Sequence, residues 1–156
     1  RRTFFLGYSA FFGSGLMSLV ARLTNVIPVD PDAHLLAAMK AGAAGLRAGL
    51  ILCVFPEGGR SFDGSLQAFK KGASILAREL SVPVVPAAIR GTHEVWPRDS
   101  IRIRPHPVSV EFGKPMSPAP AAGPDPYAAD TERLRDAVAG LIRDARSEMR
   151  DPGLNG

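Results

Sequence analysis

The sequence predicts an α/β domain with a mixed or mostly parallel sheet flanked by helices. Along the chain, short apolar segments of strand length alternate with segments that have helical signals, which is the pattern of such folds. Residues 50–55 (LILCVF) are apolar without interruption, which is typical of a strand covered on both faces. With 156 residues, the chain is long enough to enclose one hydrophobic core.

The first third of the chain is expected to hold two strands and two helices. Thr3–Gly7 has the composition of a strand, and Phe12–Leu23 that of a helix. Asn25–Asp30 (NVIPVD) is predicted to be an edge strand, because its proline cannot donate a hydrogen bond to a neighbour. Asp32 is then placed to cap a helix over Ala33–Arg47.

The rest of the chain is predicted to form a helix, two strands and a final helix over Leu66–Leu80, Val82–Ile89, Val108–Phe112 and Pro126–Met149. Apolar residues of the final helix recur every three or four positions, which makes it amphipathic. A proline-rich connector precedes it. We therefore predict three regions: a main domain, a connector, and a C-terminal helix with its tail, over residues 1–115, 116–125 and 126–156.

The stretch FPEGGRS, which follows the apolar run, is the candidate binding site. Ligands of open α/β sheets bind beyond the carboxyl ends of strands. Gly58 and Gly59 allow backbone N–H groups to approach a ligand, and Arg60 can hold a phosphate through two parallel hydrogen bonds. Glu57 can orient that arginine, accept from a ligand hydroxyl or cap the next turn, and Ser61 adds a small donor. The alternative is a tight turn with a surface ion pair between Glu57 and Arg60.

Two neighbouring cations, Lys70 and Lys71, fall in the first turns of the helix predicted after this stretch. The helix dipole is positive there, so two cations are unfavourable unless an anion lies nearby. An anion held by Arg60, the helix N-terminus and the two lysines would remove the conflict. The alternative is that both lysines simply point into water.

The stretch FPEGGRS resembles the FPEGTRS motif of the glycerolipid acyltransferases, the lysophosphatidic acid acyltransferase (1-acylglycerol-3-phosphate O-acyltransferase) family. The segment SFDGSLQAFKKGASILA resembles the family's lysine-glycine helix after that motif, and VPVVPAAI resembles its VPIVPVAI block. NVIPVD falls where the family has a second motif ending in Asp-Arg. The resemblance covers about residues 3–115 and implies the glycerolipid-acyltransferase fold.

The resemblance implies an enzyme that transfers a fatty acyl group from acyl-CoA or acyl-carrier protein to a lysophospholipid hydroxyl. It assigns the glycerol phosphate to Glu57, Gly58, Arg60 and Ser61, with Gly59 in place of the usual threonine. No cofactor and no metal are expected beyond the acyl donor. The family's second motif ends in an arginine that helps to hold the phosphate, but here Pro31 follows the aspartate. A different acceptor head group is therefore an open alternative.

The family's catalytic motif is a histidine followed five positions later by an aspartate, with the histidine as general base. Neither His34 nor His93 has a carboxylate five positions on, and His106 has Glu111. In a strand, positions five apart point to opposite faces, which disfavours that pair. His34 is expected on a helix surface, and His93 is a candidate pocket residue. We expect no catalytic residue in this chain and place the motif before Arg1.

Fifteen arginines and four lysines outnumber the 15 acidic residues and give a net charge of +4, which fits an anionic partner. Bulky apolar residues near the N-terminus are candidates for peripheral membrane contact or for the core: Phe4, Phe5, Phe11, Phe12, Leu16 and Met17. Three arginines are candidates for CoA phosphates or lipid head groups, or for a solvated basic loop: Arg98, Arg102 and Arg104.

These observations leave three functions. The first is an acyltransferase domain of phospholipid biosynthesis at the cytoplasmic face of the membrane, fused to or associated with an acyl-activating domain. The second is a non-catalytic module that binds phospholipid or acyl-CoA. The third is a nucleic-acid binder, which we disfavour because aromatic residues are not interleaved with the basic ones.

Overall fold

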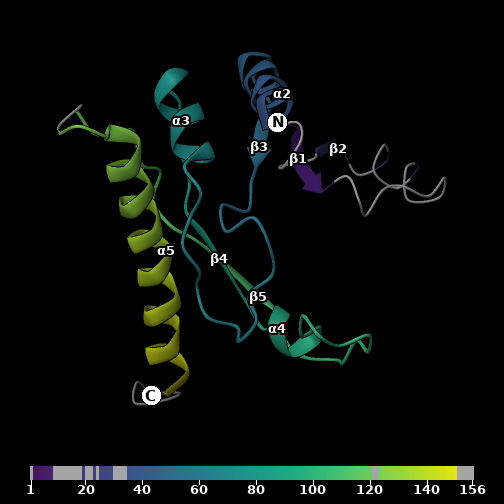
Figure 1. Cartoon of the computed structure of the whole chain (residues 1–156). Coiled ribbons are helices and arrows are strands. Elements are labelled where there is room, and N and C mark those ends of the chain that lie inside the picture. Colours follow the sequence, from purple (N-terminus) through teal and green to yellow (C-terminus); the bar gives the residue numbers. More distant parts are fainter. Residues whose placement is uncertain are drawn as a thin grey trace. The chain divides into compact units, whose positions relative to one another are not determined.

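The computed structural model describes residues 2–8, 19, 23, 25–29, 35–120 and 123–150. The chain divides into two compact units, the first formed by residues 1–55 and 78–80 and the second by residues 56–77 and 81–156. Figure 1 labels the helices and strands of both units. Each unit has its own sheet, and the two are described in turn.

The first unit contains a parallel sheet of three strands in the order β2-β1-β3. Its strands are β1 (Thr3–Tyr8), β2 (Val26–Val29) and β3 (Ile51–Cys53), and β1 pairs in parallel with both neighbours. Parallel neighbours need a crossover connection. The chain returns from β2 to the other side of β1, where β3 lies, and helix α2 (Leu35–Arg47) forms part of that connection. The prediction of an edge strand with a proline is confirmed, since Pro28 lies in β2.

A close contact between β1 and α2 lies at the core of this unit. Phe4 is only 5% exposed, and a Cβ atom built on Gly45 would lie 2.3 Å from its Cζ. The absence of a side chain at Gly45 therefore lets the aromatic ring lie directly against the helix. Ala38, another small residue of α2, is buried as well.

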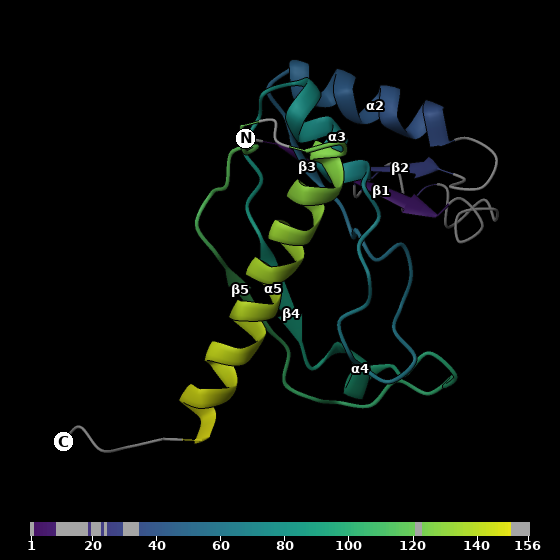
Figure 2. The ribbon, with the colours of Figure 1, turned by 60° about the vertical axis from the view of Figure 1, so that its left-hand side comes forward.

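The second unit is built on an antiparallel ribbon of β4 (Ala87–Arg90) and β5 (Ser109–Phe112). The long helix α5 (Pro126–Arg150) packs against β4, and both views show it running along the ribbon (Figures 1 and 2). The unit also contains α4 (Thr92–Val95) and most of α3 (Gly72–Glu79). Its buried apolar side chains come from α3, β4 and α5: Leu76, Ala77, Ala88, Leu134 and Val138.

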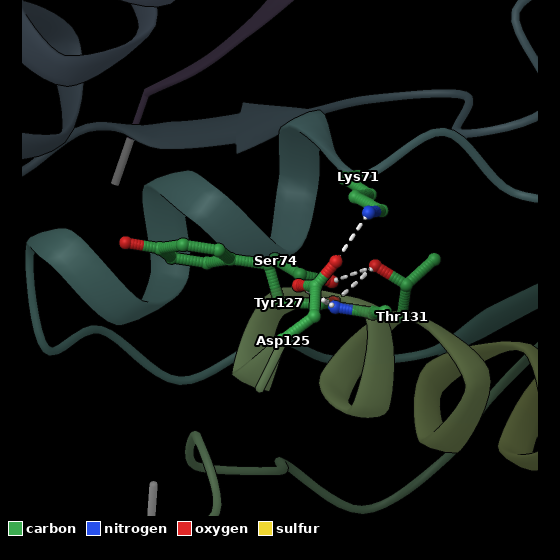
Figure 3. Close-up of polar contacts among 6 residues, drawn as sticks. Lys71, Ser74, Asp125, Tyr127 and Thr131 are labelled. Carbon is green, nitrogen blue, oxygen red and sulfur yellow. Dashed lines mark hydrogen bonds and ion pairs between the residues drawn. The ribbon is translucent and has the colours of Figure 1, made fainter. Parts of the chain in front are cut away.

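The start of α5 is fixed by Asp125, which caps the helix and pairs with Lys71 (Figure 3). One carboxylate oxygen of Asp125 accepts a hydrogen bond from the Ala128 amide at 2.9 Å. The other lies 2.5 Å from the Lys71 Nζ. Pro126 occupies the first helical position, where its missing N–H costs nothing.

A buried polar contact joins α5 to α3 beside this cap. Thr131 and Ser74, each 3% exposed, lie with their hydroxyl oxygens 2.9 Å apart (Figure 3). The Thr131 hydroxyl also donates to the Tyr127 carbonyl at 2.7 Å. Because both hydroxyls are hydrogen-bonded, their burial carries little penalty, and the contact fixes the register between the two helices.

Most predicted elements are present, but three predictions were wrong. The helix expected over residues 66–80 begins only at Gly72, and the strand expected over residues 82–89 begins only at Ala87. Pro83 and Pro86 interrupt that second segment, because neither can donate to a strand pairing. Residues 50–55 are not covered on both faces, since Ile51 is 48% exposed on an edge strand of the described sheet.

Other predictions fall partly or wholly outside the described residues. The helix expected over residues 12–23 and the capping Asp32 lie there, as do His34 and Pro31. The division into residues 1–115, 116–125 and 126–156 stays a prediction.

We predict that Gly45 in α2 and Gly140 in α5 respond oppositely to alanine. Gly45→Ala should destabilise the protein by about 1–3 kcal/mol, because the new methyl group overlaps the Phe4 ring. Gly140→Ala should be neutral or stabilising by up to about 1 kcal/mol, since nothing lies within 4 Å of its Cβ position and alanine is the better helix former. Urea denaturation of both variants measures the difference; equal effects would contradict the packing described.

We predict that the Lys71–Asp125 contact stabilises the folded protein near neutral pH and that this stabilisation is lost at acidic pH. The hydrogen bond from Lys71, followed by that from the Ala128 amide, lowers the pKa of Asp125 below its usual value. A carboxyl whose pKa is lowered on folding contributes stability above its unfolded pKa, and this contribution is lost as the pH falls through the folded pKa. Asp125→Asn, which keeps a capping oxygen, should therefore be less stable than the wild type at pH 6, with the gap closing towards pH 3 in urea denaturation.

Candidate functional site

The segment between β3 and α3, residues 56–71, forms a closed loop that we call the glycine loop. The Glu57 carboxylate accepts the Gln67 amide at 2.8 Å, and the Pro56 carbonyl accepts the Lys70 amide at 2.8 Å. A helix over residues 66–80 would need different conformations at both positions, which explains why α3 begins later. Glu57 thus closes the loop through its own carboxylate.

Lys70 lies directly over Gly58. A Cβ atom on Gly58 would lie 2.7 Å from the Lys70 Cε and 2.9 Å from its Nζ, and the φ angle of Gly58 is 73°. A side chain at Gly58 would therefore be strained and would displace the ammonium group. Among the described residues, Lys70 has no carboxylate partner. Gly59 is open, with nothing within 4 Å of its Cβ position, so a threonine would fit there.

Arg60 and Arg98 form a reciprocal contact between the glycine loop and the segment after α4. The Arg60 Nη2 donates to the Arg98 carbonyl at 3.3 Å, and the Arg98 Nη1 donates to the Arg60 carbonyl at 2.8 Å. Each guanidinium also lies over an aromatic ring of the other segment, Arg60 over Trp96 at 4.5 Å and Arg98 over Phe62 at 3.9 Å. We call this arrangement the arginine clasp; Figure 2 shows the loop reaching α4.

A tight turn follows the clasp within the loop. The Ser61 Oγ accepts the Gly64 amide at 2.9 Å, and the His93 ring of α4 lies against Gly64, 3.1 Å from its Cβ position. Asp63 accepts the Ser65 hydroxyl at 2.7 Å and the Ser65 amide at 2.9 Å, and these two bonds lower the pKa of its carboxyl. Ser61 therefore shapes the turn, and His93 helps to hold it.

The predicted site residues separate into two groups. Glu57, Gly58, Gly59, Arg60, Ser61 and Lys70 belong to the glycine loop. Lys71 points instead to Asp125, so its charge is balanced by a carboxylate (Figure 3). The premise that both lysines lack an acidic partner does not hold for Lys71, which directly precedes α3 and pairs with Asp125, while a binding role of either lysine stays a prediction.

Trp96 and Phe62 were not recognised in the sequence as part of the site. The only signal was their position close to arginines, in WPR and GRSF, and a local pattern does not reveal a contact across 36 residues. The sequence indicated Arg98 as a ligand for CoA or lipid phosphates or as part of a solvated basic loop. The structure gives it a contact that holds the backbone of Arg60.

The glycine loop presents positive charge without acidic partners. Four cationic side chains lie on it or against it, and three of these, Lys70, Arg60 and Arg98, pair with no carboxylate among the described residues. A phosphate is the kind of ligand that such groups bind. A small open depression elsewhere in the second unit, lined by residues such as Ser74, Met116 and Leu134, contains none of the loop's residues.

The other described histidine, His106, donates a hydrogen bond from Nδ1 to the Pro107 carbonyl at 3.0 Å. Glu111, five positions on, pairs with Arg90 across the ribbon at 3.5 Å. Within the described ranges, no three His, Cys, Asp or Glu side chains gather as a metal site would require. Nor does any helix in the described part of the chain have the length and apolar character to span a bilayer.

Comparison with known proteins gives matches of sequence and of fold. The Acyltransferase family model matches residues 1–90. A 1-acyl-sn-glycerol-3-phosphate acyltransferase of Cocos nucifera is 33% identical over 102 residues, which cover 65% of this chain and 33% of that protein. An enzyme of the same name from Limnanthes alba is 44% identical over 68 residues, covering 44% and 24%.

The human 1-acyl-sn-glycerol-3-phosphate acyltransferase alpha is 30% identical over 102 residues, covering 64% of this chain and 35% of that protein. The chain thus spans about a quarter to a third of the length of these relatives. The crystal structure of the 1-acyl-sn-glycerophosphate (LPA) acyltransferase PlsC from Thermotoga maritima matches with a TM-score of 0.70 and 22% identity, over 98% of this chain and 59% of that one. This likeness confirms the predicted α/β fold.

We predict that Arg98 orders the glycine loop. Arg98→Ala removes a hydrogen bond and a cation–π contact that together contribute about 1 kcal/mol at an exposed site. Amide hydrogen exchange over residues 58–64 should therefore accelerate about threefold to tenfold. Arg98→Lys should not restore protection, since an ammonium lacks the planar fork that stacks and donates together. Arg102→Ala, which removes a neighbouring cation outside the clasp, serves as the control, and equal acceleration in it would contradict the assignment.

Proposed function

The chain belongs to the acyltransferase family that includes the 1-acyl-sn-glycerol-3-phosphate acyltransferases, and from this premise we propose that it forms the acceptor-binding part of an O-acyltransferase. The reaction proposed is attack of a lysophospholipid hydroxyl on the thioester carbonyl of acyl-CoA or acyl-carrier protein. A new ester forms, the thioester bond breaks, and the thiol leaves with the proton from the hydroxyl. The acceptor is 1-acylglycerol-3-phosphate or a related lysophospholipid.

The observation that carries this proposal is the position of Lys70 over Gly58 without an acidic partner among the described residues. The glycine lets the ammonium group lie against the backbone, so that the lysine and nearby backbone N–H groups can bind the same anion. The glycine loop also follows a strand of a parallel sheet, where α/β folds bind their ligands. A phosphate of the acceptor is the anion that the named relatives act on.

Each predicted residue has a role in this proposal. Lys70 and Arg60 bind the phosphate, the guanidinium through the N–H groups that the clasp leaves unused. Gly58 and Gly59 provide backbone N–H groups, while Glu57 and Ser61 hold the loop in shape through Gln67 and Gly64. Lys71 supports α5 and does not bind the acceptor. Pro31 stands where the family has an arginine, so the acceptor's head group remains open.

We also propose that the general base is none of this chain's histidines. Three contacts support this for the two histidines that the structure describes: His93 is packed on Gly64, His106 bonds the adjacent Pro107, and Glu111 pairs with Arg90. The base would then lie in a part of the protein before Arg1. The same contacts favour the second candidate, a module that binds phospholipid or acyl-CoA without catalysis. Transfer activity of the full-length protein separates the two.

The remaining parts of the proposal follow from the substrates. Both the acceptor and the product are membrane lipids, so the protein would work at the cytoplasmic face of a membrane, attached peripherally or through other regions. The acyl donor is a co-substrate, and neither a metal nor a further cofactor is needed for acyl transfer from a thioester. Fusion to or association with an acyl-activating domain is an open part of the proposal, and nucleic acid is not a proposed partner.

We predict that Arg60→Ala raises the KM for 1-acylglycerol-3-phosphate more than tenfold in the full-length protein, a loss of at least about 1.4 kcal/mol for a charge-assisted contact. Because Arg60 also holds the clasp, Arg98→Ala should raise the KM less, since it disturbs the loop without removing the proposed phosphate ligand. Arg143→Ala, on the exposed part of α5, controls for net charge. An unchanged KM in Arg60→Ala, or equal effects of all three variants, would contradict the phosphate role.

A further inference from the structure

The segment after the arginine clasp exposes two isoleucines in alternation with arginines. Residues 101–104 read IRIR, and we call them the Ile-Arg segment. Ile101 is 97% exposed and Ile103 is 68% exposed, which makes Ile101 the most exposed large apolar side chain among the described residues. Single exposed apolar residues are common on protein surfaces. Two of them at one loop tip, next to cations, indicate a surface that binds a partner.

Hydrogen bonds hold this segment in a defined conformation. The Arg104 amide donates to the Val95 carbonyl at 2.8 Å, which closes the base of the loop. The Trp96 Nε1 donates to the Ser100 carbonyl at 2.6 Å. The Ser100 hydroxyl donates to the Arg102 carbonyl at 3.1 Å and accepts the Arg102 amide at 3.0 Å. The apolar tips are therefore held in water by a structured loop.

The charges of the segment are free to meet an anionic surface. Arg102 and Arg104 are exposed, and neither side chain has a hydrogen bond or an ion pair to another described residue. Arg98, three residues before Ile101, belongs to the clasp instead. The side chains of the two arginines that alternate with the isoleucines thus bind no other described residue of the second unit.

We propose that the Ile-Arg segment is a membrane-contact element that inserts Ile101 and Ile103 into the interface of an anionic lipid bilayer, with Arg102 and Arg104 binding lipid phosphates. Apolar tips flanked by arginines complement such a surface in both polarity and charge. A protein partner or nucleic acid would match only one of these features. The segment also adjoins Trp96, on which Arg60 stacks, so contact would bring the glycine loop to the lipid surface.

The experiment measures partition of the 156-residue chain onto vesicles, and so does not depend on the proposed acyl transfer. Sucrose-loaded vesicles of phosphatidylglycerol and phosphatidylcholine are compared with vesicles of phosphatidylcholine alone. Replacing both isoleucines (Ile101→Ser with Ile103→Ser) should lower the partition coefficient on the anionic vesicles about tenfold or more. Replacing both arginines (Arg102→Gln with Arg104→Gln) should also lower it about tenfold on the anionic vesicles, and should weaken its salt dependence.

The chain provides its own reporter, because Trp96 is its only tryptophan. Its emission should shift to the blue with anionic vesicles, and the shift should disappear in the isoleucine variant. As a matched control, Val108→Ser with Val110→Ser removes two apolar side chains, each 51% exposed, just before and within β5, with no arginine between them. This control should bind vesicles as the wild type does.

The outcomes decide the proposal. Wild-type partition in the isoleucine variant, or an equal loss in the β5 control, would overturn it. A change of self-association in the isoleucine variant, with vesicle binding unchanged, would assign the segment to a protein contact and would overturn it as well. Circular dichroism of each variant confirms that the fold is kept, as expected for side chains that lie in solvent.

Discussion

Closure of the glycine loop is the constraint on which the second unit and its candidate site depend. The carboxylate of Glu57 and the carbonyl of Pro56 each accept a backbone amide from the far end of the loop, at Gln67 and Lys70. These two bonds keep residues 66–71 out of a helix and so decide where α3 begins. They also bring Lys70 back over Gly58. A single acidic side chain thereby links the local geometry of the loop to the position of its cation.

The arginine clasp shows how two like charges are tolerated side by side. Each guanidinium is directed at a backbone carbonyl and an aromatic ring of the opposite segment, which are electron-rich groups without a formal charge. The positive charge is therefore positioned but not neutralised. That distinction matters for anion binding, because a carboxylate partner in the same place would compete with the ligand. The adjacent lysines differ in the same way, since Lys71 is paired with Asp125 and Lys70 is not.

The described part of the second unit thus has acidic partners where they support structure, and none at Lys70, Arg60 and Arg98. Asp125 caps α5 and pairs with Lys71, and Glu111 pairs with Arg90 across the ribbon. Glu57, the one acidic side chain of the FPEGGRS stretch, accepts a hydrogen bond from the backbone amide of Gln67. Cations without an acidic partner among the described residues consequently lie on the loop and on the Ile-Arg segment. Both surfaces suit a lipid that has a phosphate and an apolar body.

The sequence by itself determined the features that depend on neighbouring residues. Alternating apolar segments indicated the α/β fold, Pro28 indicated an edge strand, and the apolar stripe with Pro126 at its start indicated α5. The FPEGGRS stretch indicated the family. These signals are local, because hydrophobic period, proline geometry and a contiguous motif are all read within a few residues.

Only the tertiary structure decided the partners of the charged side chains. Nothing near Lys71 in the sequence points to Asp125, and nothing near Arg60 points to Trp96 and Arg98, which lie 36 and 38 residues away. The late start of α3 has the same origin, since the bonds to Pro56 and Glu57 override the helical preference of residues 66–71. A charged side chain can pair with many groups of similar energy, and the fold selects which of them lies within reach.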